Sequence, residues 1–144
     1  MANAGKVKGV LVTGVIGEDV HVTGIRILEH ALRSAGFKVV PLGVQVPQQD
    51  FINAAKETDA DAILVSSLAG HASILMEGFR DKCVEAGLSS VLIYLGGMLV
   101  IGDAKWEDTE KMFKKMGVSR VYPPTVLPGE VISDLVVDIK GKVR

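Results

Sequence analysis

Short apolar runs alternate with amphipathic segments along the whole chain. Three of the runs are continuous and rich in aliphatic residues, which is typical of strands buried on both faces of a sheet. Two others are shorter and carry charges, and Pro41 in one of them indicates a strand at the edge of the sheet. Together the runs predict strands over 9–16, 37–43, 62–65, 91–95 and 120–122.

The segments between these runs carry apolar residues at helical spacing. In the first of them, Ile25, Leu28 and Leu32 fall on one helical face. Gly36 follows that segment, and glycine is the residue best suited to the left-handed conformation that often ends a helix. The spacing predicts helices over 22–35, 47–57, 73–86, 106–116 and 129–139.

Strands that alternate with helices in this way predict an α/β fold. We expect a single domain over 1–144, built as a doubly wound five-stranded parallel sheet of the flavodoxin-like (Rossmann-like) type with right-handed crossovers. The short second strand favours the strand order 2-1-3-4-5. In that order the switch point, where the order of the strands along the sheet reverses, lies between the first and third strands, and ligands bind beyond the carboxyl ends of the strands at such a point.

Composition narrows the class of protein further. Of the 144 residues, 48% are hydrophobic and 23% are charged, as in globular domains. The formal net charge of −1, without a basic cluster, argues against a nucleic-acid partner. No apolar run is long enough to span a membrane. Cys83 is the single cysteine, so no internal disulfide can form, and we expect a cytoplasmic protein.

The first predicted strand is followed by the segment Asp19-x-His21-x-x-Gly24. A histidine with a carboxylate two residues away is a candidate metal ligand whose imidazole the carboxylate orients. The alternative is a helix start in which Asp19 caps the helix and His21 lies exposed in the first turn. The segment alone leaves both interpretations open.

Small residues follow the third and fourth predicted strands, as Ser66-Ser67 and as Gly96-Gly97. In the predicted sheet they lie near the end of the first strand, where they would leave a slot for a flat or elongated ligand group. The alternative is that the serines cap a helix and that the glycines form a flexible strand end. A dinucleotide site is not expected, because no Gly-x-Gly-x-x-Gly follows a strand. A phosphoacceptor receiver domain would need an aspartate where the two serines stand.

The segments Asp19-x-His21-x-x-Gly24, Ser66-x-Leu68 and Gly96-Gly97, in this order and spacing, resemble the cobalamin-binding domain of adenosylcobalamin-dependent mutases and methionine synthase. Over essentially the whole chain, the sequence resembles the small cobalamin-binding subunits of glutamate mutase. Further stretches that carry this resemblance are 14–17, 50–55, 65–68 and 120–124.

The resemblance implies a role for individual residues. His21 would be the metal ligand, binding cobalt from below in place of the cofactor's own dimethylbenzimidazole (the base-off state), and Asp19 would hydrogen-bond the other imidazole nitrogen. Ser66 and Leu68 would lie beside the displaced nucleotide tail. The resemblance implies no catalytic residue on this chain and a cofactor-binding set of Gly17, Glu18, Asp19, Val20, His21, Val22, Gly24, Ser66, Ser67, Leu68, Gly96, Gly97, Met98, Leu99, Val100, Ile101 and Gly102.

The implied activity is that of an isomerase component with adenosylcobalamin as its cobalt cofactor. It would convert L-glutamate to threo-3-methylaspartate by radical rearrangement, and it would be inactive without a large catalytic subunit that contains a (β/α)8 barrel. Two small and two large chains would form a heterotetramer. The alternatives are the small subunit of an acyl-CoA mutase and a non-catalytic corrinoid carrier or sensor. The chain departs from the family pattern at Met98 and at Thr125, which follows Pro124 without an intervening glycine.

Overall fold

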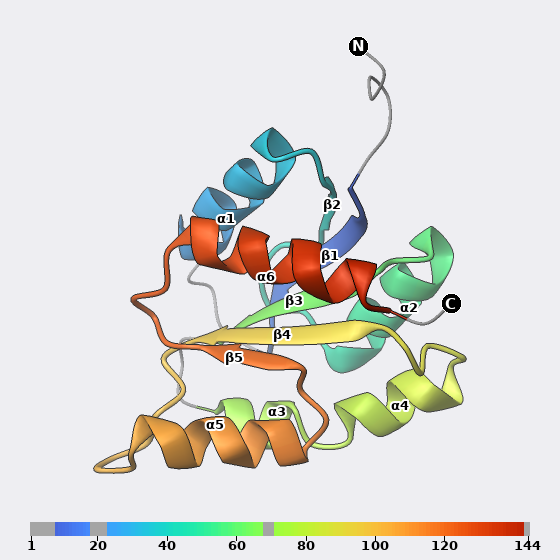
Figure 1. The fold of residues 1–144 in the computed structure, drawn as a ribbon. Coiled ribbons are helices and arrows are strands. Elements are labelled where there is room, and N and C mark those ends of the chain that lie inside the picture. The colour runs from blue at the N-terminus through green and yellow to red at the C-terminus, as the bar shows by residue number, and fades with distance from the viewer. Residues whose placement is uncertain (1–7, 18–22, 68–70, 143–144) are drawn as a thin grey trace.

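The strands form one parallel sheet in the order β2-β1-β3-β4-β5, as the sequence predicted. The structure is a computed structural model, and it describes residues 8–17, 23–67 and 71–142. The short second strand lies at an edge of the sheet, which was also predicted. In chain order the strands are β1 (Val10–Val15), β2 (Lys38–Pro41), β3 (Ala62–Ser67), β4 (Leu92–Gly97) and β5 (Arg120–Tyr122) (Figure 1).

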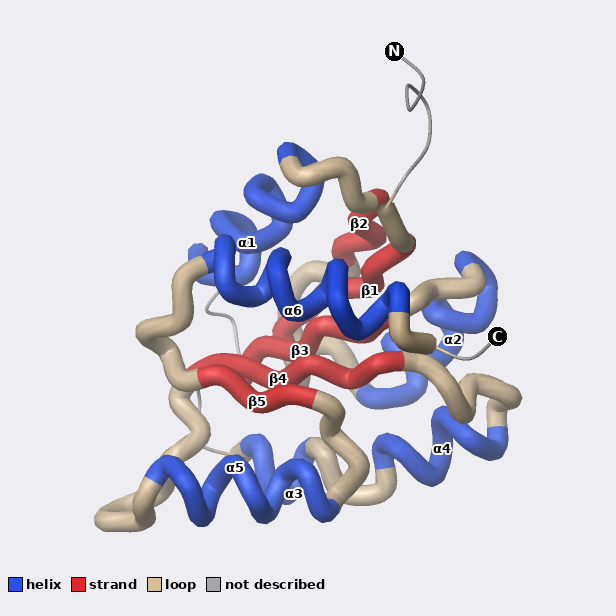
Figure 2. Tube along the Cα trace, in the orientation of Figure 1, coloured by secondary structure: helices blue, strands red, loops and turns tan. Residues whose placement is uncertain are grey.

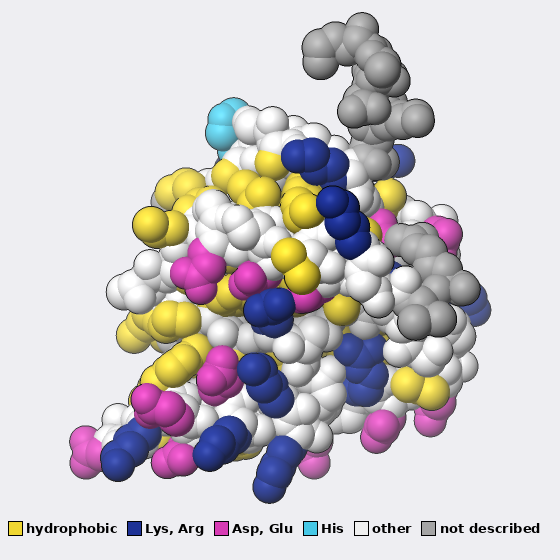
Figure 3. Space-filling view, viewed as in Figure 1, with side chains coloured by type: hydrophobic (Ala, Val, Ile, Leu, Met, Phe, Trp, Pro, Cys, Tyr) yellow, Lys and Arg dark blue, Asp and Glu magenta, His cyan; other side chains and the backbone are white. Residues whose placement is uncertain are grey.

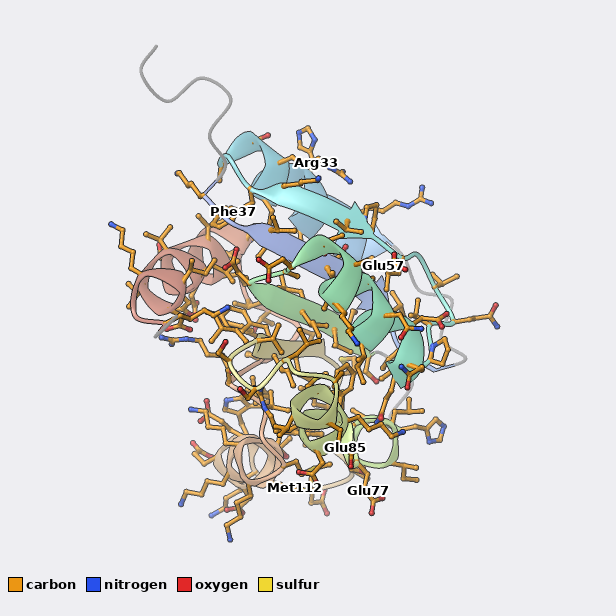
Figure 4. The ribbon with its side chains drawn as sticks, turned by 90° about the vertical axis from the view of Figure 1, so that its right-hand side faces the viewer. Arg33, Phe37, Glu57, Glu77, Glu85 and Met112 are labelled. Atoms are coloured by element: carbon orange, nitrogen blue, oxygen red, sulfur yellow. The ribbon has the colours of Figure 1, made fainter. Side chains whose placement is uncertain are left out.

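Helices cover both faces of this sheet (Figure 2). They are α1 (Thr23–Ser34), α2 (Gln48–Thr58), α3 (Ala72–Leu75), α4 (Phe79–Glu85), α5 (Trp106–Lys115) and α6 (Pro128–Lys140). Helices α1 and α6 lie side by side on one face, called here the α1/α6 face, and the other four helices cover the opposite face, the α2–α5 face. Figure 4 gives a second view of the layers, with Arg33 of α1 and Met112 of α5 on opposite sides of the sheet.

Each face of the sheet has its own hydrophobic core. On the α1/α6 face, Leu32 and Leu135 are fully buried against the strands. On the α2–α5 face, Phe51 and Phe79 pack together with their ring centroids 5.9 Å apart. The inner strand β1 is buried at every position after its first, because neighbouring strands and both helical layers enclose it.

The third predicted helix is wrong in one respect, because the structure divides it into two. The sequence predicted one helix over 73–86, whereas α3 ends at Leu75 and α4 begins at Phe79. Gly78 immediately before α4 has a φ of +74°, a left-handed conformation that interrupts the helix and that glycine adopts at little cost. The third and fourth strands also run two residues further than predicted, to Ser67 and Gly97.

Polar contacts at the amino end of the sheet tie the chain ends together. The Asp61 carboxylate accepts a hydrogen bond from the Val10 backbone N–H at 2.9 Å. Lys142 Nζ lies 3.7 Å from the same carboxylate and donates to the Asp61 carbonyl oxygen at 3.0 Å. Arg80 donates to the carbonyl oxygens of Gly117 and Val91, next to the start of β4. These charges therefore lie at the end of the sheet opposite to the predicted site.

Among the helices that the structure describes, none is both long and apolar enough to cross a membrane.

Candidate functional site

A cavity of about 280 Å³ lies between the sheet and the helices of the α1/α6 face, at the carboxyl ends of the central strands. The strands contribute Leu64, Ser66, Tyr94, Gly96 and Tyr122 to its lining. The helices contribute Ile25 and Leu28 from α1, and Pro128 and Val131 from α6. Its walls are therefore mostly apolar, with the half-buried Ser66 hydroxyl as a polar group on the sheet side.

Gly96 keeps part of this cavity open. Ser66, Gly96 and Tyr122 occupy neighbouring positions on β3, β4 and β5. A Cβ atom on Gly96 would lie 3.7 Å from Tyr122 Cβ, which is ordinary van der Waals contact. The protein thus has room for a side chain at Gly96, and that side chain would occupy space in the cavity.

Gly97 also lines the cavity, but the backbone itself requires a glycine there. A Cβ atom on Gly97 would lie 2.2 Å from the Ser67 carbonyl oxygen, and the residue has a φ of +126°. Only glycine adopts that conformation readily and permits such a close approach of two strands. The two glycines look equivalent in the sequence pattern, but a glycine is needed at each for a different reason. Gly96 leaves space in the cavity, whereas Gly97 allows the backbone conformation and the close approach to Ser67.

Ser67 points away from the cavity. Side chains alternate along a strand, so Ser66 and Ser67 face opposite sides of the sheet. Ser67 is fully buried, and its hydroxyl has no hydrogen-bond partner among the residues that the structure describes. Of the two serines predicted to contact a ligand, the structure places only Ser66 at the cavity.

A buried hydrogen bond holds α1 against the sheet beside the cavity. The Thr13 hydroxyl in β1 donates to Glu29 Oε2 of α1 at 2.5 Å, and both side chains are buried. Leu28, which precedes Glu29, contributes to the cavity wall. The bond therefore fixes the helix that forms one side of the cavity.

The segment after β4 contains exposed and buried members of the predicted set. Met98, Val100 and Ile101 expose 55%, 41% and 57% of their surface. Leu99 is only 3% exposed and packs into the core of the α2–α5 face. Packing in the core accounts for a leucine at position 99, and no contact with a ligand is needed to explain it. Gly102 follows this segment, and a Cβ atom there would meet nothing within 4 Å.

Of the predicted site residues, the structure brings Gly24, Ser66, Gly96 and Gly97 together around one cavity. Gly17 lines a separate, more open pocket together with residues of α2 and α3, next to Leu75. The remaining members of the set, Glu18, Asp19, Val20, His21, Val22 and Leu68, lie outside the described residues. Within 8–17, 23–67 and 71–142, no group of three or more His, Cys, Asp or Glu side chains could hold a metal ion. Cobalt ligation by His21 stays a prediction.

Sequence reasoning missed the two tyrosines in the cavity lining. Tyr94 lies two residues before Gly96 and so faces the same side of the sheet, which the strand alternation could have indicated. Burial is the largest cause that raises the pKa of both tyrosines above its ordinary value. Hydrogen bonds from Tyr94 to Asp138 and from Tyr122 to Asp134 raise the pKa further. Both hydroxyls therefore stay protonated at neutral pH.

Solved structures with low sequence identity share this fold. A cobalamin-binding protein from Desulfitobacterium hafniense aligns with a TM-score of 0.73 at 19% identity, over 90% of this chain and 58% of that chain. The signal receiver domain of the response regulator NarL from Mycobacterium tuberculosis aligns with a TM-score of 0.66 at 15% identity, over 94% and 98% of the two chains. This chain thus spans somewhat more than half of the first structure and nearly all of the second.

Sequence comparison gives the family. Residues 9–114 match the B12 binding domain family. The glutamate mutase sigma subunit of Clostridium tetani is 53% identical over 135 residues, which cover 94% of this chain and 98% of that protein. The glutamate mutase sigma subunit of Carboxydothermus hydrogenoformans is 54% identical over 129 residues, with coverage of 90% and 94%. This chain belongs to the B12-binding domain family and, within it, to the family of glutamate mutase sigma subunits.

Proposed function

We propose that this chain is the cobalamin-binding component of a glutamate mutase and that it works together with a separate catalytic subunit. The observation that carries the proposal is the cavity beside Ser66 and Gly96, at the point where ligands bind in this fold. The identity of 53% to a glutamate mutase sigma subunit over nearly the full length supports the same function. It also favours glutamate mutase over an acyl-CoA mutase and over a corrinoid carrier.

The cavity fits the nucleotide tail of a base-off cobalamin. A flat aromatic base needs apolar walls and few hydrogen-bonding groups, and the cavity offers Ser66 within a largely aliphatic and aromatic lining. Gly96 leaves open the space that a side chain would fill. The Ser66 hydroxyl would bind the base, and α1 and α6 would exclude water from it.

His21 would bind the cobalt and Asp19 would orient the His21 imidazole. Gly17 ends the described part of the β1 segment and α1 begins at Thr23, so both residues belong to the connection at the carboxyl end of β1. A carboxylate that accepts a hydrogen bond from the second imidazole nitrogen fixes the ring orientation and raises ligand basicity. When bound, adenosylcobalamin supplies the radical chemistry of the rearrangement.

The same edge of the protein would meet the catalytic subunit. Figure 3 shows hydrophobic side chains gathered over the beginnings of α1 and α6 and the loops near the strand ends. Ile101 after β4 and Leu127 before α6 expose 57% and 71% of their surface. A partner with a (β/α)8 barrel, in a complex of two small and two large chains, would cover this apolar edge and the upper face of the cofactor.

The substrate carboxylates would bind on the partner. Glutamate requires fixed cationic donors, but Arg80 and Arg120 already donate to groups of this chain. Arg80 also lies near the amino end of the sheet. The chain would therefore hold and present the cofactor, and it would not select the substrate.

The proposal is tested by turnover of the purified components. The chain, a glutamate mutase catalytic subunit and adenosylcobalamin are assayed together and singly, with L-glutamate or an acyl-CoA as substrate. Formation of 3-methylaspartate only by the complete mixture is the expected result. Turnover of an acyl-CoA instead, or turnover by this chain alone, would contradict the proposal.

A further inference from the structure

Five polar side chains between β4, β5 and α6 form one connected set, called here the tyrosine–aspartate network (Tyr94, Arg120, Tyr122, Asp134 and Asp138). The Tyr122 hydroxyl donates to Asp134 Oδ2 at 2.6 Å, and the Tyr94 hydroxyl donates to Asp138 Oδ2. Arg120 donates from Nε to Asp138 Oδ2 at 2.7 Å and from Nη2 to Asp138 Oδ1 at 2.9 Å. Its Nη1 lies 3.4 Å from Asp134 Oδ1.

This arrangement holds each tyrosine ring at both ends. Asp134 and Asp138 are four residues apart, so their side chains lie on the same face of α6. Arg120 links the two carboxylates, and each carboxylate accepts one tyrosine hydroxyl. The Cα atom of each tyrosine belongs to the sheet while its hydroxyl reaches the helix. The two ring centroids are 5.7 Å apart, with the ring planes inclined at 57°.

Both rings border the ligand cavity, although neither hydroxyl is available to a ligand as a donor. Tyr94 and Tyr122 expose only 2% and 6% of their surface, and both line the cavity beside Gly96. The cavity is the space next to the rings, and a ring without the hydrogen bond to its aspartate is no longer held out of that space from behind. Ring carbon atoms, held in place from behind, therefore define this side of the cavity.

We propose that the tyrosine–aspartate network is a positioning device for the ligand cavity, which keeps the Tyr94 and Tyr122 rings out of the space that the nucleotide tail of cobalamin occupies. This inference rests on the proposed function, in which the tail lies in this cavity. A network that served only to stabilise the fold as a whole would affect all ligands alike. A positioning device affects only ligands that carry the tail.

The test measures dissociation constants of the full chain for aquocobalamin and for cobinamide, which lacks the tail, by absorbance titration. Tyr122→Phe keeps the ring but removes its link to Asp134, and Asp134→Ala removes the acceptor. Asp134→Asn retains an acceptor oxygen for the Tyr122 hydroxyl. Asp61→Asn is the matched control, because it alters a buried aspartate contact at the opposite end of the sheet. The unfolding midpoint of each variant is recorded alongside.

Tyr122→Phe and Asp134→Ala are expected to weaken aquocobalamin binding about tenfold, which corresponds to about 1.4 kcal/mol of binding free energy for holding the ring out of the tail's space. Cobinamide binding stays within about twofold for both, since changes at independent sites do not couple. Asp134→Asn recovers most of the aquocobalamin affinity. Asp61→Asn lowers the unfolding midpoint without changing the ratio of the two dissociation constants.

An unchanged ratio in Tyr122→Phe and Asp134→Ala, or an equal loss for both ligands, overturns the positioning role. That outcome leaves the proposed function intact, provided that the wild-type chain binds aquocobalamin more tightly than cobinamide. A wild-type chain that binds neither ligand, or binds both equally, contradicts instead the placement of the tail in this cavity.

Discussion

Replacing Gly96 by valine is expected to weaken cobalamin binding while leaving the folded chain as stable as before or more stable. A Cβ atom at this position would meet Tyr122 Cβ at 3.7 Å and the Tyr122 carbonyl oxygen at 3.8 Å, so the protein itself accommodates it. The backbone of Gly96 is not in the left-handed region, so an L residue is not strained there. The added methyl groups project into a cavity of about 280 Å³ and compete with the ligand for its volume.

The substitution should raise the stability of the fold and lower the affinity for cobalamin, so a general loss of structure cannot explain the expected result. A glycine within a strand costs about 0.5–1 kcal/mol relative to alanine, so the free energy of unfolding of Gly96→Val should rise by up to about that amount. Extra methyl groups in a filled site cost about 1–3 kcal/mol. That cost corresponds to an increase of about 5- to 140-fold in the dissociation constant for cobalamin.

The assay compares titrations with aquocobalamin and cobinamide and adds urea unfolding of the free protein. Gly97→Ala is the contrasting variant, because its Cβ would lie 2.2 Å from the Ser67 carbonyl oxygen and should destabilise the fold itself. We expect Gly96→Val to lose affinity for aquocobalamin alone, and Gly97→Ala to lose stability and binding of both ligands. Unchanged aquocobalamin affinity in Gly96→Val would refute the assignment of the cavity to the nucleotide tail.

Three further outcomes are expected. The hydrogen bond from Arg120 is the largest cause that lowers the pKa of Asp138 in the folded state. The ionised Asp138 therefore stabilises the fold above the unfolded pKa of about 3.9, and this stabilisation is lost as the pH falls through the lower folded pKa. Acid unfolding of Asp138→Asn should therefore depend less on pH below about 4 than that of the wild type, and identical profiles would contradict this. Burial raises the pKa of the Cys83 thiol to about 11, so a thiol reagent at pH 8 should modify Cys83 only after unfolding, whereas rapid modification of the native chain would show the thiol to be accessible. Asp19→Asn should weaken cobalamin binding about 10- to 100-fold if Asp19 orients His21, and wild-type affinity would leave Asp19 as a helix cap.

The sheet was predictable because its signals are local. Continuous apolar runs indicate buried strands, and Pro41 with the neighbouring charge indicated the edge strand that the structure has as β2. The break at Gly78 was not predictable, because an isolated glycine in a helical pattern is tolerated and its φ depends on tertiary packing. The same limit applies to Leu99, whose burial on the α2–α5 face depends on how the chain turns after β4.

The candidate site was predictable only as far as its small residues. Ser66 and Gly96 stood out because small side chains at strand ends leave space. That the backbone requires a glycine at position 97 was not predictable. The register between β3 and β4 places Gly97 against Ser67, and no local sequence pattern contains that register. The network behind the cavity joins Tyr94 to Asp138 across 44 positions, so only the folded chain reveals that contact.

The identity of the cobalt ligand is the most direct test of the whole account. Electron paramagnetic resonance of cob(II)alamin bound to the full chain, prepared with ordinary histidine and with nitrogen-15 histidine, reports which nitrogen binds the metal. A His71→Asn variant serves as a control, because His71 lies exposed before α3. We predict that the triplet hyperfine splitting of the unlabelled protein becomes a doublet on labelling, that His71→Asn keeps this behaviour and that His21→Ala loses it. A splitting that labelling leaves unchanged would show that the cofactor retains its own base on cobalt, and it would contradict base-off binding through His21.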